Sequence, residues 1–145
     1  MYDLSATGFT NYVNFQGGQT VTPESANDWG WHMNWFAVAP GTVPSDSSKV
    51  CAGRSVVGNT AWLAHSGSSV YVHSDISHCG FTSIPLVVSS IGGNSDHWKS
   101  TGGSEVYDIS STRFTNYVYL LDGSTINPSL ANDWKWHINF IAYMP

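Results

Sequence analysis

Residues 132–142 read Asn-Asp-Trp-Lys-Trp-His-Ile-Asn-Phe-Ile-Ala, and residues 27–37 read Asn-Asp-Trp-Gly-Trp-His-Met-Asn-Trp-Phe-Ala. The match extends outward from this stretch without a gap, so that residues 1–40 align with residues 106–145 at a constant offset of 105 positions. About half of the aligned positions are identical, which chance does not produce over such a length. The chain therefore contains an internal repeat, and the repeat governs its organisation.

A single unrepeated segment lies between the two copies. It opens with residues 41–49, a stretch rich in Pro, Gly and Ser that is typical of a linker. Residues 50–105 follow and are called the head half; residues 1–40 are the N-terminal half-unit, and residues 106–145 are the C-terminal half-unit. Residues 50–145 are thus predicted to form one complete unit of a tandem array with a period of about 105 residues. The N-terminal half-unit is predicted to be the second half of a preceding unit.

The composition favours β-structure over helix. Only 10% of the residues are charged, against about 25% in an ordinary soluble domain, and aromatic residues reach 14%. Glu, Lys and Arg, which usually cover surface helices, are scarce, whereas aromatic residues suit strands. Apolar side chains alternate with polar ones in both half-units, and in the second copy the apolar run is Trp134, Trp136, Ile138, Phe140 and Ala142. This period of two predicts an all-β fold, an antiparallel β-sandwich.

The pattern also predicts individual elements. Residues 69–73 and 84–88 are expected to be strands of the head half because they are rich in β-branched and aromatic residues. Each half-unit also contains a capping residue followed by proline, Thr22-Pro23 in the first copy and Asn127-Pro128 in the second. A cap followed by proline predicts one short helical turn at each of these two places.

The chain has two cysteines, Cys51 and Cys79, and both lie in the head half. Their spacing matches neither a CxxC motif nor a four-cysteine zinc site. A disulfide between them would close a loop of moderate length and stabilise the fold by roughly 3 kcal/mol. We predict this disulfide because the composition resembles that of secreted proteins, and two buried free thiols in a cytosolic protein are the alternative.

The sequence offers little for nucleic acid, membranes or catalysis. A net charge of −5 and five scattered Lys and Arg residues argue against nucleic-acid binding, and no apolar run approaches the roughly 20 residues that cross a bilayer. G-x-S-x-G, H-E-x-x-H and phosphate-loop motifs are absent, so we predict no enzyme activity and no cofactor. Calcium binding at Asp46, Asp96 or Asp133 stays open, without an EF-hand spacing to support it.

The order of these features resembles the H-type lectin domain, a small β-sandwich first described in snail agglutinins and similar to phage and bacterial fibre tips. The resemblance covers most of residues 62–143 and rests on Trp62 and on residues 70–81, 84–91, 106–110, 114–115 and 136–141. It implies a fold that binds sugars, typically of the galactosamine type, in clefts between the subunits of a trimer. Residues 92–103 and 122–133 make this chain longer than the family.

One loop has the residue types of a sugar site. Such sites combine an aromatic face, which stacks on a pyranose, with planar polar groups that bind hydroxyls. The loop that follows Gly92 holds all of these types in Asn94, Asp96, His97 and Trp98, which are the candidate glycan contacts. The alternative is an ordinary polar loop with Trp98 tucked beneath it.

His137 and Asn139 alternate away from the Trp-rich face, and the first copy repeats them as His32 and Asn34. They could contact a ligand. We predict instead a hydrogen-bonded pair that ties one sheet to the other, since buried polar groups are normally paired.

The chain has two half-units and one head half, and this ratio favours a self-assembling structural protein over a lectin. Two half-units share one head half, so one half-unit lacks a partner within the chain, and its sheet edges and apolar surface favour association. We predict an extracellular structural subunit of a fibre or surface adhesin, which assembles with a neighbouring subunit or an upstream repeat through Trp29, Trp31 and Trp35. The alternative is a multivalent lectin that gains avidity by repeating weak sites.

Overall fold

The computed structural model describes residues 20–30 and 49–144. The chain divides into two compact units, Met1–Met33 and Asn34–Pro145. Within the described residues, no helix is long and apolar enough to cross a membrane.

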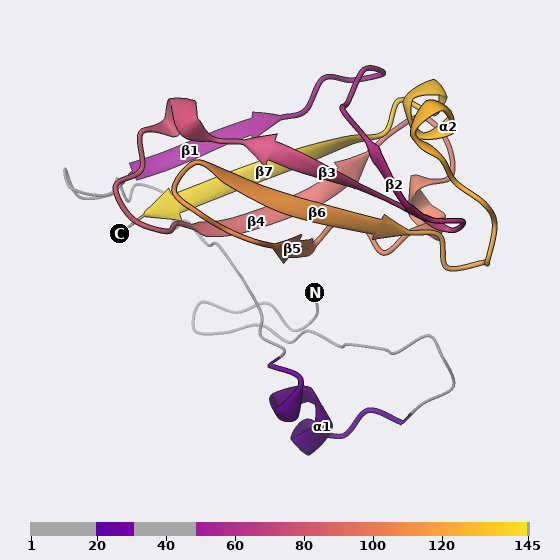
Figure 1. Cartoon of the computed structure of the whole chain (residues 1–145), viewed down its shortest axis with the longest axis horizontal. Helices are drawn as coiled ribbons and strands as arrows, with labels where there is room; N and C mark the ends of the chain where they lie inside the picture. The colour runs from indigo at the N-terminus through magenta and orange to yellow at the C-terminus, as the bar shows by residue number, and fades with distance from the viewer. Residues whose placement is uncertain (1–19, 31–48, 145) are drawn as a thin grey trace, which may run out of the picture. The chain divides into compact units, whose positions relative to one another are not determined.

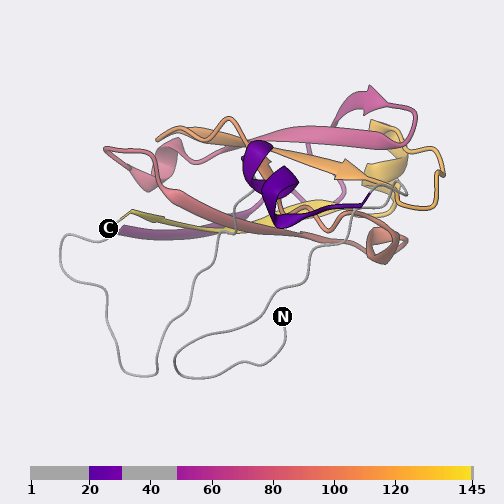
Figure 2. The same ribbon diagram turned by 90° about the horizontal axis from the view of Figure 1, so that it is seen from below.

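The second unit consists of two antiparallel sheets that face each other (Figures 1 and 2). The three-stranded sheet has the order β1-β7-β4 and is formed by Lys49–Arg54, His137–Met144 and Leu86–Gly92. The four-stranded sheet has the order β2-β3-β6-β5 and is formed by Leu63–Ser66, Ser69–Asp75, Arg113–Tyr119 and Glu105–Tyr107. The predicted all-β antiparallel sandwich is therefore confirmed, while the tandem array stays a prediction. β1 begins at Lys49, the last residue of the predicted linker.

The core lies between the two sheets and follows the predicted period of two. Ile138, Phe140, Ala142 and Met144 are buried on the inner face of β7, and the ring of Phe140 meets that of Phe114 on β6 at 5.3 Å between centroids. The prediction that Trp134 shares this strand face is wrong. Trp134 caps the C-terminus of a helix and is only half-buried, because β7 does not begin until His137.

The C-terminal half-unit supplies an inner strand to each sheet. β6 pairs with β3 on one side and β5 on the other, and β7 pairs with β1 and β4. The head half supplies β1, β2, β3 and β4, and β5 straddles the boundary between the two segments. A half-unit without a head half would therefore leave both edges of β7 and at least one edge of β6 unpaired.

The two copies of the repeat form the same helix. α1 spans Pro23–Asp28 with Thr22 as its N-cap, and α2 spans Pro128–Asp133 with Asn127 as its N-cap. Each cap side chain accepts a hydrogen bond from the backbone N–H three residues later, so the predicted capped helical turns are confirmed. The residue after each helix C-cap is left-handed in both copies, with φ of 68° at Gly30 and 60° at Lys135.

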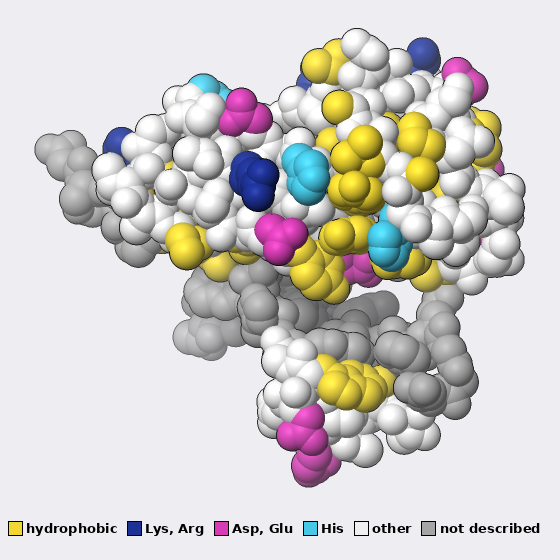
Figure 3. Space-filling view, in the orientation of Figure 1, with side chains coloured by type: hydrophobic (Ala, Val, Ile, Leu, Met, Phe, Trp, Pro, Cys, Tyr) yellow, Lys and Arg dark blue, Asp and Glu magenta, His cyan; other side chains and the backbone are white. Residues whose placement is uncertain are grey.

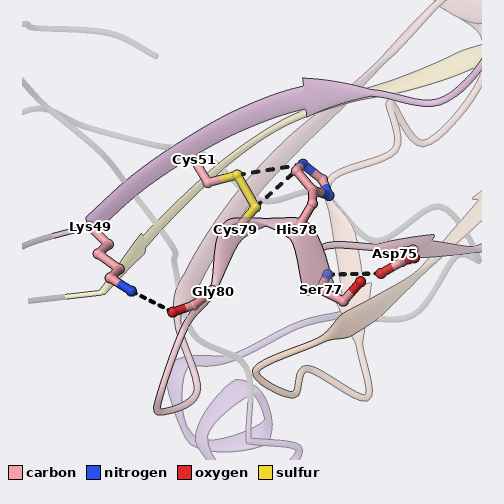
Figure 4. The surroundings of a disulfide bond; sticks show 7 residues. All are labelled: Lys49, Cys51, Asp75, Ser77, His78, Cys79 and Gly80. Atoms are coloured by element: carbon pink, nitrogen blue, oxygen red, sulfur yellow. Dashed lines mark hydrogen bonds between the residues drawn. A yellow bond between two sulfur atoms is a disulfide. The ribbon is translucent and has the colours of Figure 1, made fainter.

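The predicted disulfide between Cys51 and Cys79 is confirmed, with Cα atoms 5.7 Å apart. It joins β1 to η1, the short 3₁₀ helix Ser77–Cys79 (Figure 4). The same corner is held by two further contacts: Lys49 Nζ donates to Gly80 O, and the backbone N–H of Ser77 donates to Asp75 Oδ1 at 2.8 Å. This hydrogen bond holds the pKa of Asp75 below its usual value. η2 spans His97–Lys99 in the loop after β4.

Candidate functional site

Three side chains of the C-terminal half-unit fasten it to the rest of the sandwich, and Asn132 on α2 is the first of them. Its Oδ1 accepts a hydrogen bond from the backbone N–H of Thr60 at 2.9 Å, and its Nδ2 donates to the backbone carbonyl of Thr60 at 3.0 Å. The Asn132 amide thus pairs with both the backbone N–H and the backbone carbonyl of Thr60, as a residue on a neighbouring strand would.

Trp136 is the second and has the largest fully buried side chain of the sandwich. Its indole Nε1 donates to the carbonyl of Ser95 at 2.7 Å, and its own carbonyl accepts from the indole of Trp62 at 3.3 Å. A Cβ added at Gly93 would lie 2.6 Å from Trp136 Cδ1, so the loop after β4 packs directly on the ring. Trp136 therefore fills the core and anchors this loop.

Asn116 on β6 is the third and joins the two sheets. Its side chain is fully buried, and Nδ2 donates to Ser89 Oγ on β4 and to the carbonyl of Gly103, both at 2.9 Å. These two bonds pair the amide nitrogen, whereas Oδ1 has no partner within the described residues. A buried N–H group costs free energy unless it is paired, so the two bonds favour this arrangement of the sheets over others.

All three residues recur in the N-terminal half-unit as Asn11, Asn27 and Trp31. Asn27 lies on α1 and is exposed; Asn11 and Trp31 lie outside the described residues. Of the predicted assembly residues, Trp29 follows α1 and is 48% exposed, and Trp35 also lies outside the described residues. The first copy thus repeats the side chains through which the second copy holds the head half.

The predicted glycan loop does expose an aromatic ring. Trp98 is 65% exposed, so the alternative that it is tucked beneath the loop is wrong, and its ring lies edge-on to that of His97 at 5.1 Å. Asn94 is also exposed, whereas Asp96 and His97 are partly buried. Asp96 forms an ion pair with Lys99 at 3.2 Å, and this hydrogen-bonded carboxylate raises the pKa of Lys99. Asp96 is therefore engaged in holding the loop.

A second cluster, which sequence reasoning missed, covers the outer face of the four-stranded sheet. We call it the aromatic face, and Figure 3 shows hydrophobic side chains gathered beside histidines on this side of the molecule. Register places Tyr71 beside Tyr117 and His73 beside Thr115 on the neighbouring strand. The aromatic face consists of His65, Tyr71, His73, Tyr107, Tyr117 and Tyr119.

A hollow of about 210 Å³ adjoins the aromatic face before β2 begins at Leu63, where residues 72–75 of β3 have no β2 residue paired to them. His73 contributes to both the hollow and the aromatic face. Ser74 lines the hollow and is buried, and within the described part of the chain its Oγ has no hydrogen-bond partner. The remaining polar lining comes from Arg54, Asn59 and Asp75, among other residues.

The predicted link between His137 and Asn139 does not tie the sheets together. Both residues point away from the core, because Ile138 and Phe140 occupy the alternate inward positions of β7. His137 Nδ1 instead contacts the carbonyl of Lys135 at 2.8 Å, beside the left-handed residue that follows α2.

Comparison with known protein families, with characterised proteins and with solved structures finds no match to this chain. Its function therefore has to be inferred from its own residues.

Proposed function

We propose that this chain is a non-catalytic, extracellular structural subunit of a fibre or surface adhesin, built from tandem β-sandwich units and assembled through its N-terminal half-unit. One observation carries the proposal. Asn116, Asn132 and Trp136, which fasten the C-terminal half-unit to the rest of the sandwich, recur as Asn11, Asn27 and Trp31.

The partner of the N-terminal half-unit is a head half from an upstream unit or from a neighbouring subunit. The aligned segment contains inner strands of both sheets, which require neighbours to pair their backbone groups. Its apolar positions are retained as well, and burying a large aromatic side chain contributes roughly 2–3 kcal/mol. Trp29, Trp31 and Trp35 together therefore favour association strongly.

The extracellular location is supported by chemistry. A disulfide links Cys51 and Cys79, and disulfides persist mainly in oxidising compartments. The low content of charged residues is typical of secreted fibre and adhesin domains.

Deletion of residues 1–40 is expected to abolish self-association while leaving residues 49–144 folded, because those residues form a complete core. Sedimentation velocity measures association, and circular dichroism checks the fold. Trp31→Ser with Trp35→Ser should reproduce the deletion. Glu24→Ser is the control and should leave self-association unchanged. It only introduces the serine that stands at the aligned, exposed position 129 of the C-terminal half-unit. If the deleted chain assembles as well as the full chain, assembly through the N-terminal half-unit is wrong.

A multivalent lectin is the second candidate, and the exposed ring of Trp98 beside His97 and Asn94 favours it. An exposed indole can stack on the apolar face of a pyranose while neighbouring amide and imidazole groups bind its hydroxyls. The resemblance to the H-type lectins adds galactosamine-type sugars as the first class to test.

Trp98→Ala is expected to abolish binding to immobilised N-acetylgalactosamine, whereas Trp98→Phe retains an aromatic ring and should keep part of it. The alanine variant should change the free energy of unfolding by less than about 0.5 kcal/mol, because the ring is mostly in solvent. A glycan array and a thermal melt make the two measurements. Equal binding by the wild type and Trp98→Ala would exclude this loop as a sugar site.

A further inference from the structure

The aromatic face has an unusual chemical character. Its six side chains combine apolar ring surface with phenol hydroxyl and imidazole groups, and none of them is Lys or Arg. Glu105, on the same face opposite Tyr117, is partly buried, and this burial raises the pKa of its carboxyl group. The six rings themselves are polar without fixed charge, and the nearest arginine on the same outward side of β6 is Arg113, which stands in register with Asp75.

The rings of this face are already packed before any ligand arrives. Tyr71 and Tyr117 stack at 5.3 Å with 22° between their planes, and Tyr107 meets Tyr117 edge-on at 5.4 Å. His65 lies 5.0 Å from Tyr117 on the opposite side. A ligand that binds here immobilises few side chains, and such preorganisation lowers the entropic cost of binding.

Each histidine is held through one ring nitrogen and offers the other. His65 Nδ1 contacts Ser69 Oγ at 3.0 Å and the hydroxyl of Tyr119 at 3.2 Å. His73 Nδ1 contacts Thr115 Oγ1 at 2.9 Å. Among the described residues no hydrogen bond reaches the Nε2 atom of either ring, so each can bind a hydroxyl group as donor or acceptor according to the tautomer.

The hollow beside β3 is an independent indication of a ligand. It meets the aromatic face at His73, on the outward side of β3, and continues past the strand edge to Ser74 on the inward side, whose buried Oγ has no partner within the described residues. Buried polar atoms are normally hydrogen-bonded, so an unpaired one points to a group that binds there. The hydrogen bond from the Ser77 backbone favours the carboxylate form of Asp75, an acceptor for hydroxyl groups, and Arg54 and Asn59 add donors.

We propose that the aromatic face, together with this hollow, is a binding site for a neutral oligosaccharide. A sugar chain presents apolar C–H faces to the tyrosine rings and hydroxyl groups to the imidazoles, to Ser74 and to Asp75. A purely apolar partner would leave these polar groups without hydrogen bonds, which costs free energy. A sulfated or phosphorylated partner would find two arginines, Arg54 in the hollow and Arg113 on β6, but it would also meet the carboxylate of Asp75, which lines the hollow and stands opposite Arg113 in the strand register. The residues of this site belong neither to the N-terminal half-unit nor to residues 93–99.

The test uses the full, isotope-labelled chain and three neutral probes: cellohexaose, maltohexaose and fully N-acetylated chitohexaose. At least one probe is expected to shift the backbone amide resonances of β3, β5 and β6 with a dissociation constant of about 1 mM or tighter. Tyr107→Ser is expected to weaken this binding at least tenfold, and its side chain is 55% exposed on an edge strand, so the fold should survive. Ser74→Val should weaken binding by removing the unpaired hydroxyl.

Two matched controls should bind like the wild type. Ile84→Ser alters an exposed apolar residue just before β4, in the other sheet, and Trp98→Ala alters the loop after β4. The proposal is overturned if none of the three probes shifts these amides at about 10 mM. It is also overturned if the shifts centre on residues 93–99, if only a heparin hexasaccharide binds, or if the same amides shift with protein concentration alone. The last result would make this face a contact between copies.

Discussion

Trp136→Ala is expected to lower the free energy of unfolding of the sandwich by about 3–5 kcal/mol, the range typical of removing a fully buried tryptophan. The loss has two physical sources. The substitution leaves a cavity between the C-terminal half-unit and the head half. It also removes the hydrogen bond of 2.7 Å that the indole N–H donates to the carbonyl of Ser95. The loop after β4, which packs on the ring at Gly93, loses its anchor at the same time.

Chemical denaturation measures this change, and Trp98→Ala is the matched control. Both substitutions remove an indole, but Trp98 is mostly in solvent, so its loss should cost less than about 0.5 kcal/mol. A melting temperature within a few degrees of wild type for Trp136→Ala would contradict the buried position, since each kcal/mol corresponds to roughly 4–8 °C in a domain of this size. The result also bears on assembly, because Trp136 is the counterpart of Trp31.

Replacing both cysteines, Cys51→Ser with Cys79→Ser, is expected to cost about 3 kcal/mol. The disulfide spans 28 residues, and opening it frees the unfolded chain to explore more conformations, which favours unfolding. It also releases β1, an edge strand of the three-stranded sheet, from η1. Denaturation with and without reductant measures the contribution.

The double serine variant is its own control, because reductant should leave its stability unchanged while destabilising the wild type to a similar level. Alkylation of two thiols in the untreated, native protein would contradict the disulfide. So would a wild-type melting curve that reductant does not move.

Features that depend on residues close in the chain could be predicted from the sequence. The helix caps at Thr22 and Asn127 required only a capping side chain followed by proline. The inner face of β7 followed from the alternation of apolar residues from Ile138 onward. Trp134 fits the same alternation but belongs to a helix cap, since the pattern does not mark where a strand begins.

Of the two candidate sites, only the one whose residues are contiguous in the chain could be predicted. The loop with Asn94 and Trp98 was found because its residue types are contiguous in the chain. The aromatic face was missed, although Tyr71 and His73 alternate with buried valines and Tyr117 and Tyr119 alternate with Asn116 and Val118. Each alternation indicated a strand with one outward face. Neither alternation indicated that the two strands are neighbours in one sheet, so that their outward faces form a single surface.

The sequence alone thus determined the repeat, the all-β class, the inward-facing positions of β7 from Ile138 onward and the two residues of the disulfide. Each depends on composition, periodicity or the identity of a few residues. Only the tertiary structure decided that β3 pairs with β6, which brings Tyr71 against Tyr117, and that Asn132 reaches Thr60. These contacts join residues far apart in the chain, and their register is set by how the whole core packs, because a shift of one residue would turn every inward side chain outward.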